Sequence, residues 1–140
     1  MGYKISTVWK DKMAFESQLG SHVVRMGTTP ALGDDSGPSP KQLVLAGLAG
    51  CTGMDVVSLL RKMRVDFKDF EINIEADLTE DHPIVFSEIR ISYLIFGKDV
   101  NKDKVKKAID LSQEKYCGVS AMLKKNSPIS YTISYADEQG

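Results

Sequence analysis

The sequence predicts an α+β fold, in which antiparallel sheets surround a long central helix and a later pair of helices covers the sheet. Six segments alternate apolar and polar residues, which is the period of strands with one wet face. One long apolar stretch carries several helix-start signals, and a later segment has the apolar period of an amphipathic helix. The chain has 140 residues. That length fits one domain, residues 1–140, with enough interior for a core.

The strands are predicted from strict alternation. Between the fourth and the fifth, Asp81-His82-Pro83 supplies turn residues, which predicts a long antiparallel hairpin. Each strand is expected to have one wet face. The six predicted strands lie at residues 3–9, 13–18, 22–26, 70–78, 89–95 and 129–135.

The central helix is predicted at residues 40–64. Ser39 can cap it, Pro40 suits the first helical position, and Gln42 completes a Ser-x-x-Gln capping box. Basic residues close the last turn, where the helix dipole favours cations. The apolar run at residues 43–60 has the length of a membrane span, but Thr52, Asp55, Ser58 and three glycines lower its hydrophobicity. We therefore expect a buried helix of a soluble protein.

Three glycines at three-residue spacing lie within this helix, namely Gly47, Gly50 and Gly53. Each costs about 1 kcal/mol of helix propensity relative to alanine, so local preference does not explain them. Close packing of another element against that face is the favoured explanation. A small ligand cavity beside Cys51 is the alternative.

Two helices are predicted after the hairpin, at residues 101–116 and 119–125. Gly118 interrupts the pattern directly after Cys117, which places that cysteine near a helix N-terminus. Peptide dipoles there lower the pKa of a thiol, which is a physical reason to expect a reactive cysteine.

The two cysteines, Cys51 and Cys117, are the best functional clue. They stand 66 positions apart, which excludes a CxxC motif, and they are too few for a secreted disulfide scaffold. Residues 1–10 lack the apolar core of a signal peptide, so we expect a cytoplasmic protein. A net charge of −1 gives no electrostatic footprint for nucleic acid. In a reducing compartment such a pair is catalytic, redox-active or simply buried.

Three motifs together resemble the OsmC/Ohr family. They are Ser39-Pro40-Lys41-Gln42-Leu43, the stretch from Leu45 to Cys51-Thr52, and Tyr116-Cys117-Gly118-Val119-Ser120. The resemblance covers essentially the whole chain, and the sequences of its motifs are closer to the OsmC-like branch than to the Ohr enzymes. It implies an intertwined homodimer with a role in stress response, in which a cysteine of the central helix meets one from the later helix pair at the dimer interface.

The resemblance also implies a thiol-dependent hydroperoxide reductase. Cys51 would attack the peroxide and become a sulfenic acid, Cys117 would resolve it to a disulfide, and a thiol reductant would restore the pair. No metal or organic cofactor is implied. Apolar neighbours of the thiol, namely Leu48, Met54 and Val119, would favour organic peroxides.

The chain departs from the family pattern at the charged residues. The family has a glutamate ten positions before the first cysteine, where this chain has Lys41, expected to point into water. Arg25 is the best candidate for the guanidinium that stabilises the thiolate, with Asp34 or Asp35 as its acid. Asp55 lies one helical turn after Cys51. It could pair with Arg25 or a partner-subunit base, bind a helix terminus or turn away, and a structural role is favoured.

Two other interpretations stay open. The chain could be a non-enzymatic dimer that binds a ligand or partner and has lost efficient catalysis, or both thiols could be inert core residues. A zinc site that combines His22 and His82 with the cysteines is rejected, because neither spacing resembles a structural zinc motif.

Overall fold

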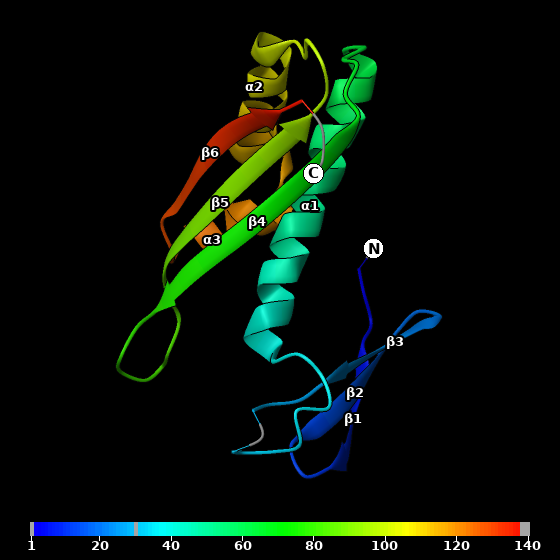
Figure 1. The fold of residues 1–140 in the computed structure, drawn as a ribbon. Helices are drawn as coiled ribbons and strands as arrows, with labels where there is room; N and C mark the ends of the chain where they lie inside the picture. Colours follow the sequence, from blue (N-terminus) through cyan, green and yellow to red (C-terminus); the bar gives the residue numbers. More distant parts are fainter. Residues whose placement is uncertain (1, 30, 138–140) are drawn as a thin grey trace. The chain divides into compact units, whose positions relative to one another are not determined.

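A computed structural model describes residues 2–29 and 31–137, and the elements follow the predicted order. The chain divides into two compact units, residues 1–46 and 47–140, and the long helix α1 (Pro40–Lys62) runs from the first into the second. The α+β class is confirmed, while the single domain stays a prediction. Figure 1 shows the other elements, which are β1 (Ser6–Asp11), β2 (Ala14–Leu19), β3 (His22–Met26), β4 (Asp69–Leu78), β5 (Phe86–Phe96), α2 (Lys102–Leu111), the π-helical turn η1 (Ser112–Tyr116), α3 (Gly118–Lys124) and β6 (Ile129–Ala136).

The first unit contains a three-stranded antiparallel sheet in the order β1-β2-β3. β1 begins at Ser6 rather than at residue 3, and it is exposed along its whole length. The prediction of one wet face is therefore wrong for β1, because the residues on both of its faces are exposed. β2 buries Ala14 and Ser17, which lie three positions apart.

The loop that follows β3 folds back onto the end of that strand. The Gly27 N–H donates to the Pro38 carbonyl at 2.9 Å. A Cβ on Gly37 would lie 2.6 Å from the Arg25 carbonyl oxygen, so only glycine fits this approach. The predicted capping box is present at the start of α1, with Ser39 N–H donating to Gln42 Oε1 at 2.8 Å and Gln42 N–H donating to Ser39 Oγ at 3.2 Å.

The second unit is built on a sheet in the order β4-β5-β6. β4 and β5 form the predicted long antiparallel hairpin, whereas β6 joins β5 in parallel. Side chains of β5 alternate, and the buried set packs beneath the helices, which lie on one face of the sheet in Figure 1. This core set is Ile89, Ile91, Tyr93 and Ile95, joined by Leu48, Val56 and Leu60 of α1 and by Val105, Ala108 and Ile109 of α2.

α1 is buried along one line only, formed by Leu48, Thr52, Val56 and Leu60. Four-residue spacing places these side chains on one face of the helix. An 18-residue window of α1 has a mean hydropathy of 1.9, and 22% of that window is buried. The length and composition would suit a membrane span, but core helices share this property. The expectation of a buried helix thus holds for one side of α1, and the residues on its other sides are exposed or half-buried.

The predicted helix at residues 101–116 changes from an α-helix to a π-helical turn before its end. Asn101 caps α2 through a bond from the Lys104 N–H, and the α-helix ends at Leu111. The next turn is π-helical, since the Cys117 N–H donates to the Ser112 carbonyl at 2.8 Å. A π-helical turn inserts a residue into the helical repeat and shifts the side chains that follow, and such turns are frequent at functional sites.

Candidate functional site

The two cysteines come together in the second unit. The Sγ atoms of Cys51 and Cys117 and a carboxylate oxygen of Asp55 all lie within 4.8 Å of one another. Cys51 is partly exposed and Cys117 is buried at 3% exposure. Both cysteines are free thiols. The site is therefore a reduced dithiol with one sulfur partly open to solvent and a carboxylate beside both.

A hydroxyl pair joins the helix that carries Cys51 to the turn that carries Cys117. Thr52 Oγ1 and Ser112 Oγ are 2.8 Å apart, and both residues are fully buried. Thr52 directly follows Cys51, while Ser112 begins the turn whose C-terminal flank is Cys117. This contact fixes α1 against η1 at the level of the two sulfurs.

Asp55 is held by the same cluster, because Ser112 Oγ donates to Asp55 Oδ2 at 3.0 Å. Ser112 has one hydroxyl proton, so its oxygen must accept from Thr52. Thr52 then accepts from Tyr93, whose phenol oxygen lies 2.7 Å away. Gln113 Nε2 completes the chain by donating to the Tyr93 oxygen at 2.9 Å. Every hydroxyl in this buried network thus donates toward the Asp55 carboxylate, which fixes its orientation.

Burial is the main cause of the pKa values in this cluster. Burial raises the pKa of the Tyr93 phenol, against hydrogen bonds with Thr52 and Gln113 that lower it. Burial also raises the pKa of the Cys117 thiol, and the nearby Cys51 adds to that direction, while hydrogen bonds from Ser120 oppose it.

Cys117 is the N-cap of α3, and its Sγ accepts from the Ser120 N–H at 3.4 Å. The predicted position at a helix start is therefore confirmed. The expected lowering of its pKa is wrong, because desolvation outweighs the helix-start hydrogen bond. Cys117 keeps its proton more readily than a solvated thiol does.

A cavity of about 280 Å³ reaches Asp55 between α1 and Tyr116. Lys62 and Met54 line it as well. Of the Cys51, Asp55 and Cys117 group, Asp55 lines this cavity and the two cysteines do not.

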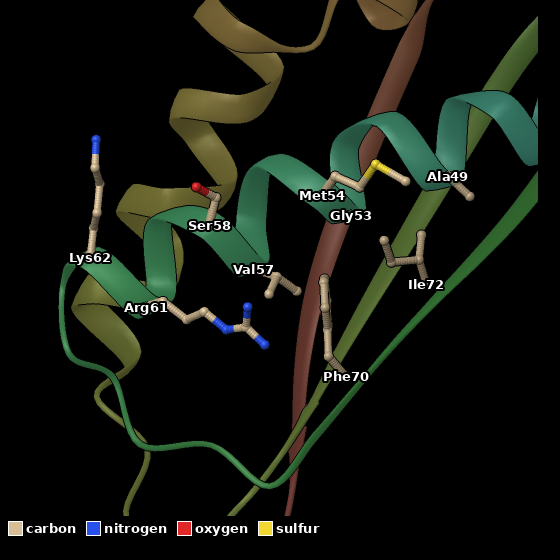
Figure 2. A pocket seen from close by; sticks show the side chains of 10 residues that line it. Ala49, Gly53, Met54, Val57, Ser58, Arg61, Lys62, Phe70 and Ile72 are labelled. Atoms are coloured by element: carbon tan, nitrogen blue, oxygen red, sulfur yellow. The ribbon is translucent and has the colours of Figure 1, made fainter.

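A larger groove of about 940 Å³ follows the uncovered side of α1 along β4. Figure 2 shows Val57 and Arg61 of α1 on the side of the helix that faces Phe70 of β4, with Ile72 of the same strand beside them and Met54 lying along the helix. The groove is apolar except for Arg61, Lys62 and Ser58, which lie toward the end of α1. Met54 and Lys62 line both this groove and the smaller cavity.

The three glycines of α1 differ in how closely other atoms approach them. A Cβ on Gly53 would meet Ile72 Cδ1 at 3.0 Å, whereas one on Gly47 or Gly50 would meet nothing within 4 Å. The close-packing explanation is therefore right for Gly53 and wrong for the other two within this chain. Gly50 and Gly53 line the groove, but Cys51 does not, so the alternative of a small cavity beside Cys51 stays a prediction.

The charged residues predicted for the site have their own partners. Arg25 lies on β3 in the first unit, where its Nη1 donates to Glu16 Oε2 at 2.8 Å. The predicted acids are wrong, since Asp34 Oδ1 accepts from the Ser36 N–H and the guanidinium of Arg25 pairs with Glu16. Lys41 is exposed, as expected. Among the described residues, neither histidine joins the Cys51, Asp55 and Cys117 group.

Sequence reasoning missed Ser112, Thr52, Tyr93 and Gln113 as parts of the site. One signal was available, because Ser112 falls on the apolar side of the predicted helix at residues 101–116. A polar residue on a buried face needs a hydrogen-bond partner, and that partner is here Thr52.

Comparison with known families identifies the fold. The family of OsmC-like proteins matches residues 33–132. The chain belongs to the OsmC-like family. This OsmC-like chain is 36% identical over 129 residues to Protein YhfA of Escherichia coli strain K12, covering 91% of this chain and 92% of that protein.

Solved structures share the architecture of this OsmC-like protein. A hypothetical protein from Aquifex aeolicus VF5 is 29% identical with a TM-score of 0.83, over 98% of this chain and 99% of that one. The organic hydroperoxide resistance protein OhrB of Bacillus subtilis is 19% identical with a TM-score of 0.66, over 95% and 98% of the two chains. At that identity the second likeness concerns the OsmC-like fold alone.

Proposed function

We propose that this OsmC-like protein is a thiol-dependent reductase of organic hydroperoxides. The observation that carries the proposal is the approach of two sulfurs, 66 positions apart in sequence, to within 4.8 Å. Inert core cysteines do not need to meet, whereas a nucleophilic and a resolving thiol must.

The reaction has two steps that balance within the site. Cys51 attacks one oxygen of the hydroperoxide, the O–O bond breaks, and the products are an alcohol and a sulfenic acid on Cys51. The Cys117 thiol then attacks the Cys51 sulfur, and a disulfide and one water form. A small dithiol or a cellular thiol returns the pair to the reduced state.

The environments of the two sulfurs support this assignment of roles. Cys51 is the more exposed of the two, so a peroxide reaches it first. Cys117 is buried and its pKa is raised, which suits a thiol that stays protonated until a sulfenic acid forms beside it. Cys117 reacts with the sulfenic acid rather than with the peroxide, because the sulfenic acid forms on Cys51, directly beside the Cys117 sulfur.

Organic peroxides are the substrate class that fits the surroundings. Gly50, next to Cys51 in sequence, lines the groove along α1. We propose that an alkyl or aryl tail lies in this groove against Val57, Phe70 and Ile72. Each Å² of apolar surface removed from water contributes about 25 cal/mol. The likeness in fold to an organic hydroperoxide resistance protein points the same way. We further propose that the enzyme acts as a homodimer, as the family resemblance implies, and that it acts in the cytoplasm.

Hydroperoxide consumption tests the proposal. With dithiothreitol as reductant, the wild type should consume cumene hydroperoxide, and Cys51→Ser should lose this activity. Cys117→Ser should form a sulfenic acid that dimedone traps. Ser130→Ala, a change of an exposed hydroxyl on β6, is the matched control. Equal rates in the wild type and Cys51→Ser would reject the function.

Arg25 enters the same assay as a proposed thiolate-stabilising residue. Its guanidinium forms a part-exposed ion pair with Glu16 within the first unit. Arg25→Ala should slow hydroperoxide consumption more than Arg25→Lys does, because lysine keeps the charge. Unchanged rates in both variants would remove Arg25 from the proposed mechanism.

A non-enzymatic dimer that binds an apolar ligand is the second candidate. The groove of about 940 Å³ and the presence of Lys41 where the family has a glutamate favour it. This candidate predicts that ligand binding persists in Cys51→Ser while no variant consumes peroxide.

A further inference from the structure

We propose that the reduced site binds Zn²⁺ or another thiophilic divalent cation through the Cys51 and Cys117 sulfurs and the Asp55 carboxylate. The three donor atoms belong to one compact unit and lie within 4.8 Å of one another. Tetrahedral zinc has Zn–S bonds of about 2.3 Å, which holds two sulfurs roughly 3.8 Å apart. The side chains therefore reach one ion by rotations that move the donor atoms by about 1 Å.

The Asp55 carboxylate is held beside the two sulfurs by a hydrogen bond. Ser112 donates to Asp55 Oδ2, and this bond leaves Oδ1 without a hydrogen-bond partner among the described residues. Ser112 is fixed in turn by the buried hydroxyl of Thr52. Metal-binding side chains are commonly held in this way by a second layer of hydrogen bonds, which raises metal affinity.

The donor set selects the type of ion. Two thiolates and one carboxylate favour zinc and other thiophilic cations over Mg²⁺ or Ca²⁺, which prefer oxygen ligands only. Binding releases the two thiol protons. The fourth position is left to water, which enters by the cavity that Asp55 and Tyr116 line. Three protein ligands and an open position are a known arrangement for zinc.

Metal binding and disulfide formation exclude each other, because they use the same two sulfurs. This coupling rests on the proposed function, whereas metal binding alone does not. The zinc dithiolate, one hydroperoxide and two protons give the disulfide, free Zn²⁺, an alcohol and water. The ion would thus protect the thiols from peroxide, and oxidation would release it.

Metal titration of the tag-free, reduced chain tests this site without any peroxide. We expect one Zn²⁺ per chain in competition with a chromophoric chelator. With Co²⁺ as probe, a thiolate-to-metal charge-transfer band should appear in the near ultraviolet. Asp55→Asn should weaken binding by about 10-fold or more, and Ser112→Ala by about 10-fold. Asp66→Asn, a change of an exposed carboxylate in the loop after α1, is the control.

The outcomes separate the two proposals. Zinc affinity that is unchanged in Asp55→Asn, or that survives conversion of the pair to the disulfide, overturns the metal site. A chain that binds zinc but consumes no hydroperoxide overturns the proposed function and leaves the metal site standing. A chain that consumes hydroperoxide but gives no charge-transfer band with Co²⁺ overturns the metal site and leaves the proposed function standing.

Discussion

Oxidation of the Cys51 and Cys117 pair should stabilise the folded chain. The two sulfurs already lie within 4.8 Å of each other, so a bond between them requires only a local rearrangement. The bond closes a loop of 66 residues. Constraining the unfolded chain over a loop of that length contributes about 4 kcal/mol, and strain from drawing the sulfurs together reduces the gain to about 2–4 kcal/mol.

Urea denaturation measures this gain. For a slope of about 2 kcal/mol per molar urea, the transition midpoint should rise by about 1–2 M in the oxidised protein. The protein is treated with one equivalent of cumene hydroperoxide, and peptide mapping without reductant identifies the disulfide. Cys117→Ser, treated in the same way, should show no increase. A disulfide that leaves the midpoint unchanged or lowers it would refute the reasoning, because the native fold would then not hold the sulfurs in bonding reach.

Three further predictions concern stability. Thr52→Ala removes a buried hydroxyl bonded to three partners and should cost about 1–3 kcal/mol in urea denaturation, while Thr7→Ala, at a part-buried bond, should cost clearly less. Because the pKa of Cys117 is raised in the fold, the unfolded chain loses that proton first. Stability of the wild type should therefore fall relative to Cys117→Ser as the pH rises above about 8.5, and a constant difference between them would contradict this. Gly50→Ala should stabilise α1 by up to about 1 kcal/mol, and Gly53→Ala by less because its Cβ meets Ile72. Destabilisation by Gly50→Ala would contradict this, because it would mean that a Cβ at this position meets other atoms in solution.

Local signals predicted where the elements begin. The start of α1 followed from Ser39, Pro40 and Gln42, and the structure contains the reciprocal bonds of that capping box. Strand alternation placed the β4 and β5 hairpin in the same way. These features depend on neighbours in sequence, so the sequence alone contains the information that determines them.

The site depends on contacts between distant residues, which no local pattern determines. The approach of Cys51 to Cys117 is set by the hydroxyl pair of Thr52 and Ser112, 60 positions apart. The π-helical turn before Cys117 was also missed, because its composition does not differ from that of an α-helix. The position of Cys117 at a helix start predicted a lowered pKa, but its pKa is raised, because the burial of its sulfur is not visible in the sequence.

A single-turnover titration tests the central claim most directly. The fully reduced chain, free of other thiols, receives less than one equivalent of cumene hydroperoxide under anaerobic conditions. We predict that each hydroperoxide consumed removes two thiols and yields one cumyl alcohol and one intramolecular disulfide between Cys51 and Cys117. Peroxide that remains unreacted while both thiols are still titratable would contradict the account.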